Sequence, residues 1–141
     1  MDVFSKMGRD LLPEETVEYF SGFSSAPHQH IIYKKLSEYT MAEWVFCLYE
    51  KVLLEQCVPQ FFDVLDKDPL SPGIYYKGEI LYHITLIDKA FWSAHEDWLE
   101  FFKKITHRAL DMAVKELADS NITNIYIEAY RNFAGSDNKE S

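Results

Sequence analysis

Apolar residues recur three or four positions apart along most of the chain, the spacing that places them on one face of an α-helix. The pattern is clearest from Met41 to Val58, where apolar side chains cover nearly the whole circumference. Thr40 and Glu43 form a capping-box pattern at its start, and Pro59 predicts a stop or kink near its end. A helix that is apolar on nearly every side is expected to be central in the fold. Its narrow polar stripe consists of Glu43, Cys47 and Glu50.

Similar patterns predict helices on both sides of this segment. Ser93-Ala94-His95-Glu96 is a second capping-box pattern, and it introduces a long amphipathic stretch that ends near residues 119–121. Asn121 is a candidate cap for a last amphipathic helix. The predicted helical segments are 13–20, 27–39, 41–58, 60–65, 79–92, 93–119 and 122–133.

Residues 74–87 fit two structures. One set of apolar residues between 80 and 91 recurs at helical spacing, whereas an overlapping set between 80 and 86 alternates as in a strand. Lys77 and Gly78 could turn a hairpin between that strand and residues 74–76. The length of the apolar repeat favours a helix that begins at about Glu79.

Together these segments predict an all-α protein, a single-domain bundle of about six or seven helices around one core. A hairpin at 74–87 would change the class to α+β with a small sheet. A length of 141 residues suits one domain, which we expect over residues 1–133. Residues 134–141 contain no apolar anchor and are expected to be a disordered tail.

The chain is acidic, with a formal net charge of −9. This balance disfavours nucleic acids and anionic membranes as partners, and it suits a protein that meets one basic protein partner. The first ten residues contain no apolar run typical of a secretion signal. No segment has the roughly 18–20 apolar residues of a membrane helix, so we expect a cytoplasmic protein. The sequence carries no signal for an oligomeric state.

Motifs for chemistry are absent from the sequence. There is no glycine-rich phosphate loop and no GxSxG nucleophile motif. His95-Glu96 is like the start of a zinc-protease motif, but Leu99 stands where that motif needs a second histidine. Cys47 and Cys57 would lie about 15 Å apart on one straight helix, beyond disulfide reach, and are expected to be buried thiols. We therefore expect no catalytic residue, cofactor or metal, and a protein that is not an enzyme.

Acidic residues gather in two groups that few basic residues oppose. Such a surface steers a cationic partner and raises its association rate. Two adjacent tyrosines beside a Pro- and Gly-containing loop add aromatic area of the kind found in interface hot spots. Lysine at both Glu43 and Glu50 is expected to weaken partner binding and leave the fold intact. The predicted partner-binding residues are Glu43, Glu50, Asp63, Asp66, Asp68, Tyr75 and Tyr76, with Glu96, Asp97 and Glu100 as a second group.

A small, acidic, helix-rich chain without catalytic motifs resembles the bacterial immunity proteins of toxin delivery systems, above all those of contact-dependent growth inhibition (CDI). The nearest local match is Glu18-Tyr19-Phe20-Ser21-Gly22-Phe23, which is similar to an early Tyr-Phe segment in some of these families. The His-Gln-Asp-Trp that follows in those families is absent here. The resemblance implies binding to one protein toxin, often a basic nuclease, and it assigns no role to a single residue.

Three functional hypotheses follow. The first is an immunity protein that neutralises a cognate toxin, a basic nuclease, by blocking its active site or substrate groove. Carboxylates would take the places of phosphates, and tyrosines would be the desolvated anchors. The second hypothesis is a helical adaptor or regulatory protein-binding module without a toxin partner. The third is a small carboxylate-based enzyme, which requires a deep pocket with several acids of raised pKa.

Overall fold

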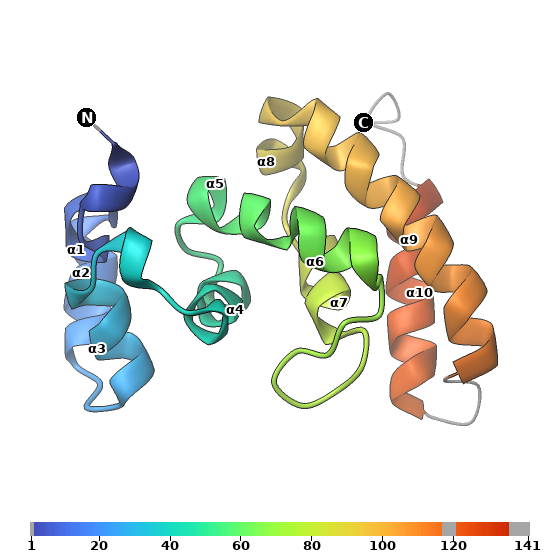
Figure 1. Cartoon of the computed structure of the whole chain (residues 1–141), viewed down its shortest axis with the longest axis horizontal. Coiled ribbons are helices and arrows are strands. Elements are labelled where there is room, and N and C mark those ends of the chain that lie inside the picture. Colours follow the sequence, from blue (N-terminus) through green and yellow to red (C-terminus); the bar gives the residue numbers. More distant parts are fainter. Residues whose placement is uncertain (1, 117–120, 136–141) are drawn as a thin grey trace. The chain divides into compact units, whose positions relative to one another are not determined.

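The computed structural model describes residues 2–116 and 121–135, with side chains for 2–113 and 124–135 (Figure 1). Within these ranges the regular structure is helical and no strand is formed, which confirms the predicted all-α class. The alternative hairpin at 74–87 is wrong, because residues Glu79–Thr85 form a helix. Met7 and Lys35 pair through an isolated bridge of extended backbone.

The chain divides into two compact units, Met1–Gln60 and Phe61–Ser141. The single domain expected over residues 1–133 stays a prediction. Of the expected tail, Ala134 and Gly135 complete the last helix, and residues 136–141 lie outside the described residues. We call the two units unit 1 and unit 2.

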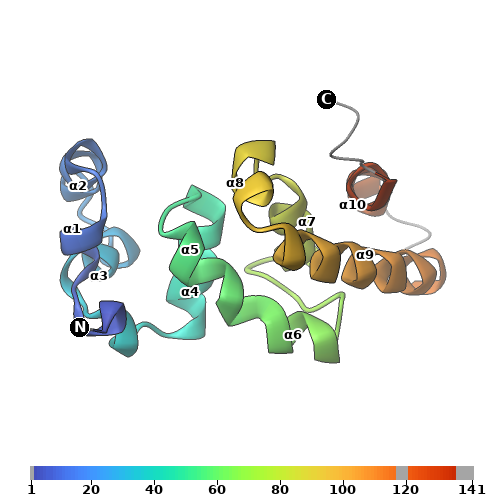
Figure 2. The same cartoon turned by 90° about the horizontal axis from the view of Figure 1, so that it is seen from above.

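Unit 1 is organised around one short helix, α3, which packs against α1, α2 and α4. Ile31 and Ile32 of α3 are fully buried. Gly8 of α1 approaches α3 so closely that a side chain there would overlap the Ile31 carbonyl. Figure 2 shows α1, α2 and α3 grouped together. The elements of unit 1 are η1 (Val3–Ser5), α1 (Gly8–Leu11), α2 (Glu14–Ser21), α3 (Ala26–Tyr33), η2 (Leu36–Glu38), α4 (Met41–Glu50), α5 (Leu54–Cys57) and the start of η3 (Val58–Phe61).

The helix predicted over 41–58 is interrupted. Lys51 and Leu53 adopt left-handed backbone conformations, with φ of 57° and 53°, and they separate α4 from α5. The amides of Lys51 and Val52 donate to the carbonyls of Leu48 and Cys47, which is the hydrogen-bonding pattern of a Schellman motif. The predicted stop near Val58 is confirmed, because α5 ends at Cys57 and Pro59 lies in η3, but the earlier break between α4 and α5 was not predicted.

The capping box at the start of α4 is confirmed, but two of the three residues of the predicted polar stripe are buried. Thr40 accepts a hydrogen bond from the Glu43 amide, and the Glu43 carboxylate accepts one from the Thr40 amide. Glu43 is only 7% exposed and Cys47 is fully buried, whereas Glu50 is exposed. The sequence pattern missed this burial because α3 covers the face of α4 that carries Glu43.

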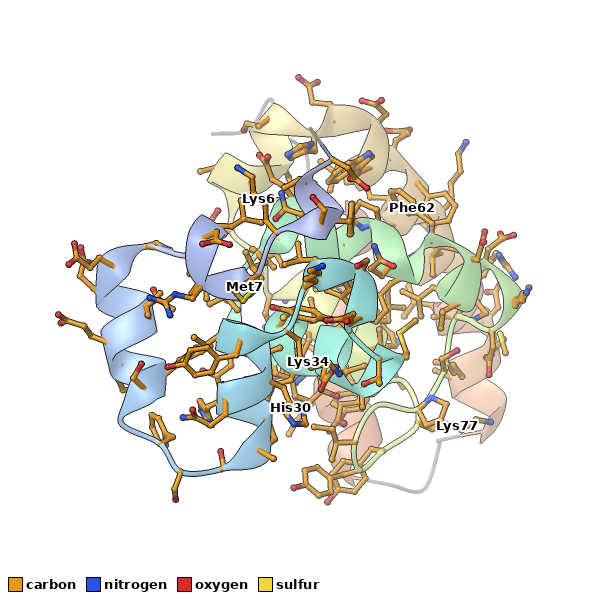
Figure 3. All side chains as sticks on the ribbon, turned by 60° about the vertical axis from the view of Figure 1, so that its left-hand side comes forward. Lys6, Met7, His30, Lys34, Phe62 and Lys77 are labelled. Atoms are coloured by element: carbon orange, nitrogen blue, oxygen red, sulfur yellow. The ribbon has the colours of Figure 1, made fainter. Side chains whose placement is uncertain are left out.

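Glu43 joins α3 to α4. Its carboxylate lies 2.6 Å from Nδ1 of His30, a residue of α3, and 2.7 Å from Nζ of Lys34, the C-cap residue of that helix (Figure 3). Burial alone would raise the pKa of Glu43. Hydrogen bonds from Lys34, the Thr40 amide and His30, together with the charge of Lys34, outweigh that effect, so the pKa of Glu43 lies below its ordinary value.

The two cysteines lie on different helices rather than on one straight helix, and both thiols are free and buried. Burial raises the pKa of Cys47 to about 12, and it also raises the pKa of Cys57 well above its ordinary value. We expect neither thiol to react with a thiol–disulfide exchange reagent at pH 8 in the native protein, because thiolate and access are both lacking. Both should react at once in denaturant. Rapid reaction of either thiol in the native protein would contradict this burial.

Unit 2 is built on α9 and α10, which lie side by side, with α7 against α10 and α8 against α9 (Figures 1 and 2). Phe102 of α9 and Tyr130 of α10 are fully buried in its core. The elements of unit 2 are α6 (Phe62–Lys67), α7 (Glu79–Thr85), α8 (Lys89–Ala94), α9 (Glu96–Glu116) and α10 (Asn121–Gly135).

The second predicted capping box, at Ser93, is wrong. Ser93 lies inside α8, whose N-cap is Asp88, and the Asp88 carboxylate accepts a hydrogen bond from the Phe91 amide. His95 ends α8, and α9 begins at Glu96. The predicted helix over 79–92 is accordingly divided between α7 and α8. The predicted end of the long helix near residue 119 lies outside the described residues.

Candidate functional site

The loop between α6 and α7 presents three consecutive large side chains to solvent. Ile74 is 54% exposed, Tyr75 is 77% exposed and Tyr76 is 48% exposed. Both tyrosines were predicted to be accessible, and the structure confirms their exposure. Contiguous apolar exposure of this kind commonly marks a surface that binds another protein.

At least four hydrogen bonds hold the backbone of this loop. The Gly73 amide donates to the Tyr76 carbonyl at 3.1 Å, and the Gly78 amide donates to the Leu70 carbonyl at 2.9 Å. The Tyr75 amide donates to the carboxylate of Glu79, a buried residue, at 3.0 Å. The fourth bond comes from α10. The exposed side chains therefore project from an ordered backbone, which lowers the entropy lost when a partner binds.

That fourth bond joins residues far apart in the sequence. The Tyr130 hydroxyl donates to the Gly78 carbonyl at 2.6 Å, and both residues are buried. Gly78 has φ of 82°, a left-handed conformation that glycine adopts without strain. Burial raises the pKa of Tyr130, so its hydroxyl stays protonated and remains a donor.

The acids predicted near this loop differ in their surroundings. Asp63 and Asp66 are exposed. Asp66 lies 3.1 Å from Arg108 of α9, which also donates to the Asp66 carbonyl. Asp68 is half-buried and accepts a hydrogen bond from the Leu70 amide, so it stabilises the start of the loop. An exposed ion pair contributes little, and Asp66 therefore stays accessible to a partner's cation.

The remaining predicted acids lie on α4 and at the start of α9. Glu96, Asp97 and Glu100 are exposed at the start of α9, where the helix dipole favours negative charge without any partner. Glu50 is exposed at the end of α4, and Glu43 is occupied by its contacts to α3. Glu43 and Glu50 belong to unit 1, and the other predicted residues belong to unit 2. Binding of a partner by any of these residues stays a prediction.

The structure adds residues that the sequence analysis did not single out. Ile74 extends the exposed apolar surface of the two tyrosines, and its position directly after Pro72 and Gly73 gave a weak signal. Glu79 and Tyr130 shape the loop through side-chain hydrogen bonds to its backbone, and that of Tyr130 is a long-range contact for which the sequence carries no local pattern. In the part of the chain that the structure describes, no three His, Cys, Asp or Glu side chains are grouped to hold a metal ion.

A comparison with protein families identifies the chain. The family model of CDI immunity proteins matches residues 21–105, more than half of the length. The chain belongs to this family. No curated protein and no solved structure matches it. The resemblance inferred from the sequence is thereby confirmed.

Membership in the family indicates the general role of the chain. A CDI immunity protein neutralises a CDI toxin, so the partner of this immunity protein is a protein toxin. The matched segment contains Tyr75 and Tyr76 and all the predicted acids. It ends before α10, which supplies the Tyr130 hydroxyl. None of the described helices is long and apolar enough to span a membrane.

Proposed function

We propose that this immunity protein neutralises a basic nuclease toxin by covering its active site or its substrate groove. Family membership supports neutralisation of a toxin. The net charge of −9 supports a basic partner, because opposite charge speeds association and selects the partner. A nuclease is a toxin with a positively charged groove for phosphates, which exposed carboxylates can occupy.

The observation that carries the mechanism is the ordered loop with two exposed tyrosines inside the matched segment of an acidic chain. Tyrosine is enriched among residues that dominate binding energy, because its ring buries a large area with few rotatable bonds. Tyr75 and Tyr76 are therefore proposed as desolvated anchors. Exposed acids of unit 2, such as Asp63 and Asp66, take the places of phosphates.

Removal of the Tyr75 ring tests this mechanism. Tyr75→Ala is expected to raise the Kd for the toxin encoded beside this protein's gene by about 30-fold or more, as at an interface hot spot. Binding is measured by calorimetry, and protection by growth of cells that co-express the toxin. Because Tyr75 is 77% exposed, the variant should melt like the wild type.

Tyr33→Ala is the matched control, since Tyr33 is 51% exposed but lies on α3 in unit 1. Its Kd should stay within about 3-fold of the wild type, as for most surface truncations. Normal protection by Tyr75→Ala would exclude the loop as the anchor. A toxin that binds but cleaves neither RNA nor DNA would exclude the nuclease, and a toxin that does not bind would exclude the proposed function.

A further inference from the structure

Unit 1 contains a small open pocket that is lined by acidic side chains as well as by aromatic and apolar ones. The pocket has a volume of about 260 Å³ and lies between α2 and the end of α4. Two carboxylates and two aromatic rings contribute to its lining. Its lining residues are Glu15, Thr16, Tyr19, Phe20, Glu50 and Val52.

The charged groups of this pocket are of one sign. Glu15 and Glu50 are both exposed, and neither side chain takes part in a hydrogen bond or ion pair among the described residues. No lysine, arginine or histidine is among the lining residues. Glu50 is the last residue of α4, where the negative end of the helix dipole disfavours an anion. The C-terminal end of α4 and the two carboxylates therefore give the pocket a negative potential, and no cationic side chain of unit 1 lines it.

The rest of the lining suits the stem of a long cationic side chain. Tyr19 is 61% exposed, and an edge-on contact with Phe23 at 5.0 Å supports its ring. Aromatic faces attract ammonium and guanidinium groups, and the apolar stems of lysine and arginine pack on hydrocarbon such as Val52. A neighbouring pocket of about 430 Å³ shares Thr16 and Val52, and its lining includes four leucines as well as Lys51 and Glu55, so the apolar surface continues beyond the first pocket.

We propose that Glu15, Tyr19 and Glu50 form a binding pocket for one lysine or arginine side chain of the toxin. The proposal rests on the proposed function, and it adds a specific contact in unit 1 to the tyrosine loop of unit 2. The occupant is cationic because two carboxylates line the pocket. Its side chain is long because apolar residues of the lining, such as Val52, lie beside these carboxylates. Tyr19 belongs to α2, which precedes the matched segment, so the pocket combines a matched and an unmatched part of the chain.

Neutralisation of the two carboxylates tests the pocket. Glu15→Gln with Glu50→Gln is expected to raise the Kd for the toxin at least about 10-fold, because charge-assisted hydrogen bonds are lost. The matched control is Glu14→Gln with Glu18→Gln, two exposed acids of α2 that do not line the pocket. The control removes the same charge from exposed positions of unit 1, so it weakens long-range attraction to a similar extent. Its Kd should change by less than about 3-fold.

Tyr19 gives a second, independent measurement. Tyr19→Phe keeps the ring face and should bind within about 3-fold of the wild type, whereas Tyr19→Leu should raise the Kd about 5-fold or more. Equal losses in the carboxylate pair and its control would overturn the pocket in favour of general charge attraction. Normal binding by the carboxylate pair would also overturn it, while the proposed function would stand. Failure of the wild type to bind the toxin would overturn both.

Discussion

Lysine at position 43 is expected to lower the free energy of unfolding by about 3–5 kcal/mol, as when one partner of a buried ion pair is removed and a like charge is left behind. The new ammonium would face His30 and Lys34, which now hold the carboxylate at 2.6 and 2.7 Å. Glu50→Lys is the matched reversal on the same helix. It should change the unfolding free energy by less than about 0.5 kcal/mol, because Glu50 is exposed. Urea denaturation of both variants measures the difference.

This expectation replaces the one drawn from the sequence, in which reversal of both glutamates would leave the fold intact. Glu43→Gln separates charge from shape, since its amide oxygen can still accept the hydrogen bond from the Thr40 amide. Its loss of stability should fall between those of Glu43→Lys and the wild type. Equal stability of the two lysine variants would mean that the contacts to α3 contribute nothing.

The same contacts predict a pH dependence. Because the pKa of Glu43 is lower in the folded chain, its carboxylate contributes stability that is fully present above the unfolded pKa of about 4.3. That contribution is lost as the pH falls through the folded value. The stability difference between the wild type and Glu43→Gln should therefore be largest above about pH 5 and shrink in more acidic solution. A difference that grows on acidification would contradict the lowered pKa.

Alanine at position 78 is expected to disrupt the tyrosine loop and to lower the unfolding free energy by about 2–4 kcal/mol, from backbone strain and a lost buried hydrogen bond. The backbone there has φ of 82°, and a Cβ atom would lie 2.6 Å from the Tyr130 hydroxyl oxygen. The hydroxyl would have to leave the Gly78 carbonyl that it now binds. Toxin affinity should fall with stability, because the two exposed tyrosines lose their ordered backbone.

Two further variants test that explanation. Gly22→Ala should be nearly neutral, because Gly22 has a helical φ of −74° and a Cβ atom would meet nothing closer than 3.4 Å. Tyr130→Phe keeps the ring and removes only the donor, so it should lower stability by about 1–3 kcal/mol. If Gly78→Ala were as stable as Gly22→Ala, the left-handed conformation would not be required at this position.

The helical class could be predicted because it depends on local patterns. The capping box at Thr40 and the start of a helix at Glu79 both appear where the sequence places them. The break at Lys51–Leu53 was missed because left-handed conformations usually occur at glycine, and no glycine is present in this segment. The capping pattern at Ser93 misled because Asp88 provides an earlier cap, and the helix that follows it contains Ser93.

In the candidate site, only those residues could be predicted whose neighbours in the sequence indicate an exposed loop. Tyr75 and Tyr76 stand beside Pro72 and Gly73, and such loops lie at the surface. Glu43 shows the opposite case, because its polar side chain suggested a surface position and only its contacts with α3 explain its burial. The pocket at Glu15 and Glu50 depends on two helices that meet in space, so no local pattern could have indicated it.

The hydrogen bond between Tyr130 and Gly78 also determines how late the tyrosine loop is completed during synthesis of the protein. A ribosome makes both tyrosines of the loop long before it makes the Tyr130 hydroxyl that fixes their backbone, because Tyr130 lies 52 residues beyond Gly78. A nascent chain that has reached residue 105 already contains the whole matched family segment, yet its loop still lacks the hydrogen bond from Tyr130. The loop is completed only after α10 has been translated and has docked against α7 and α9.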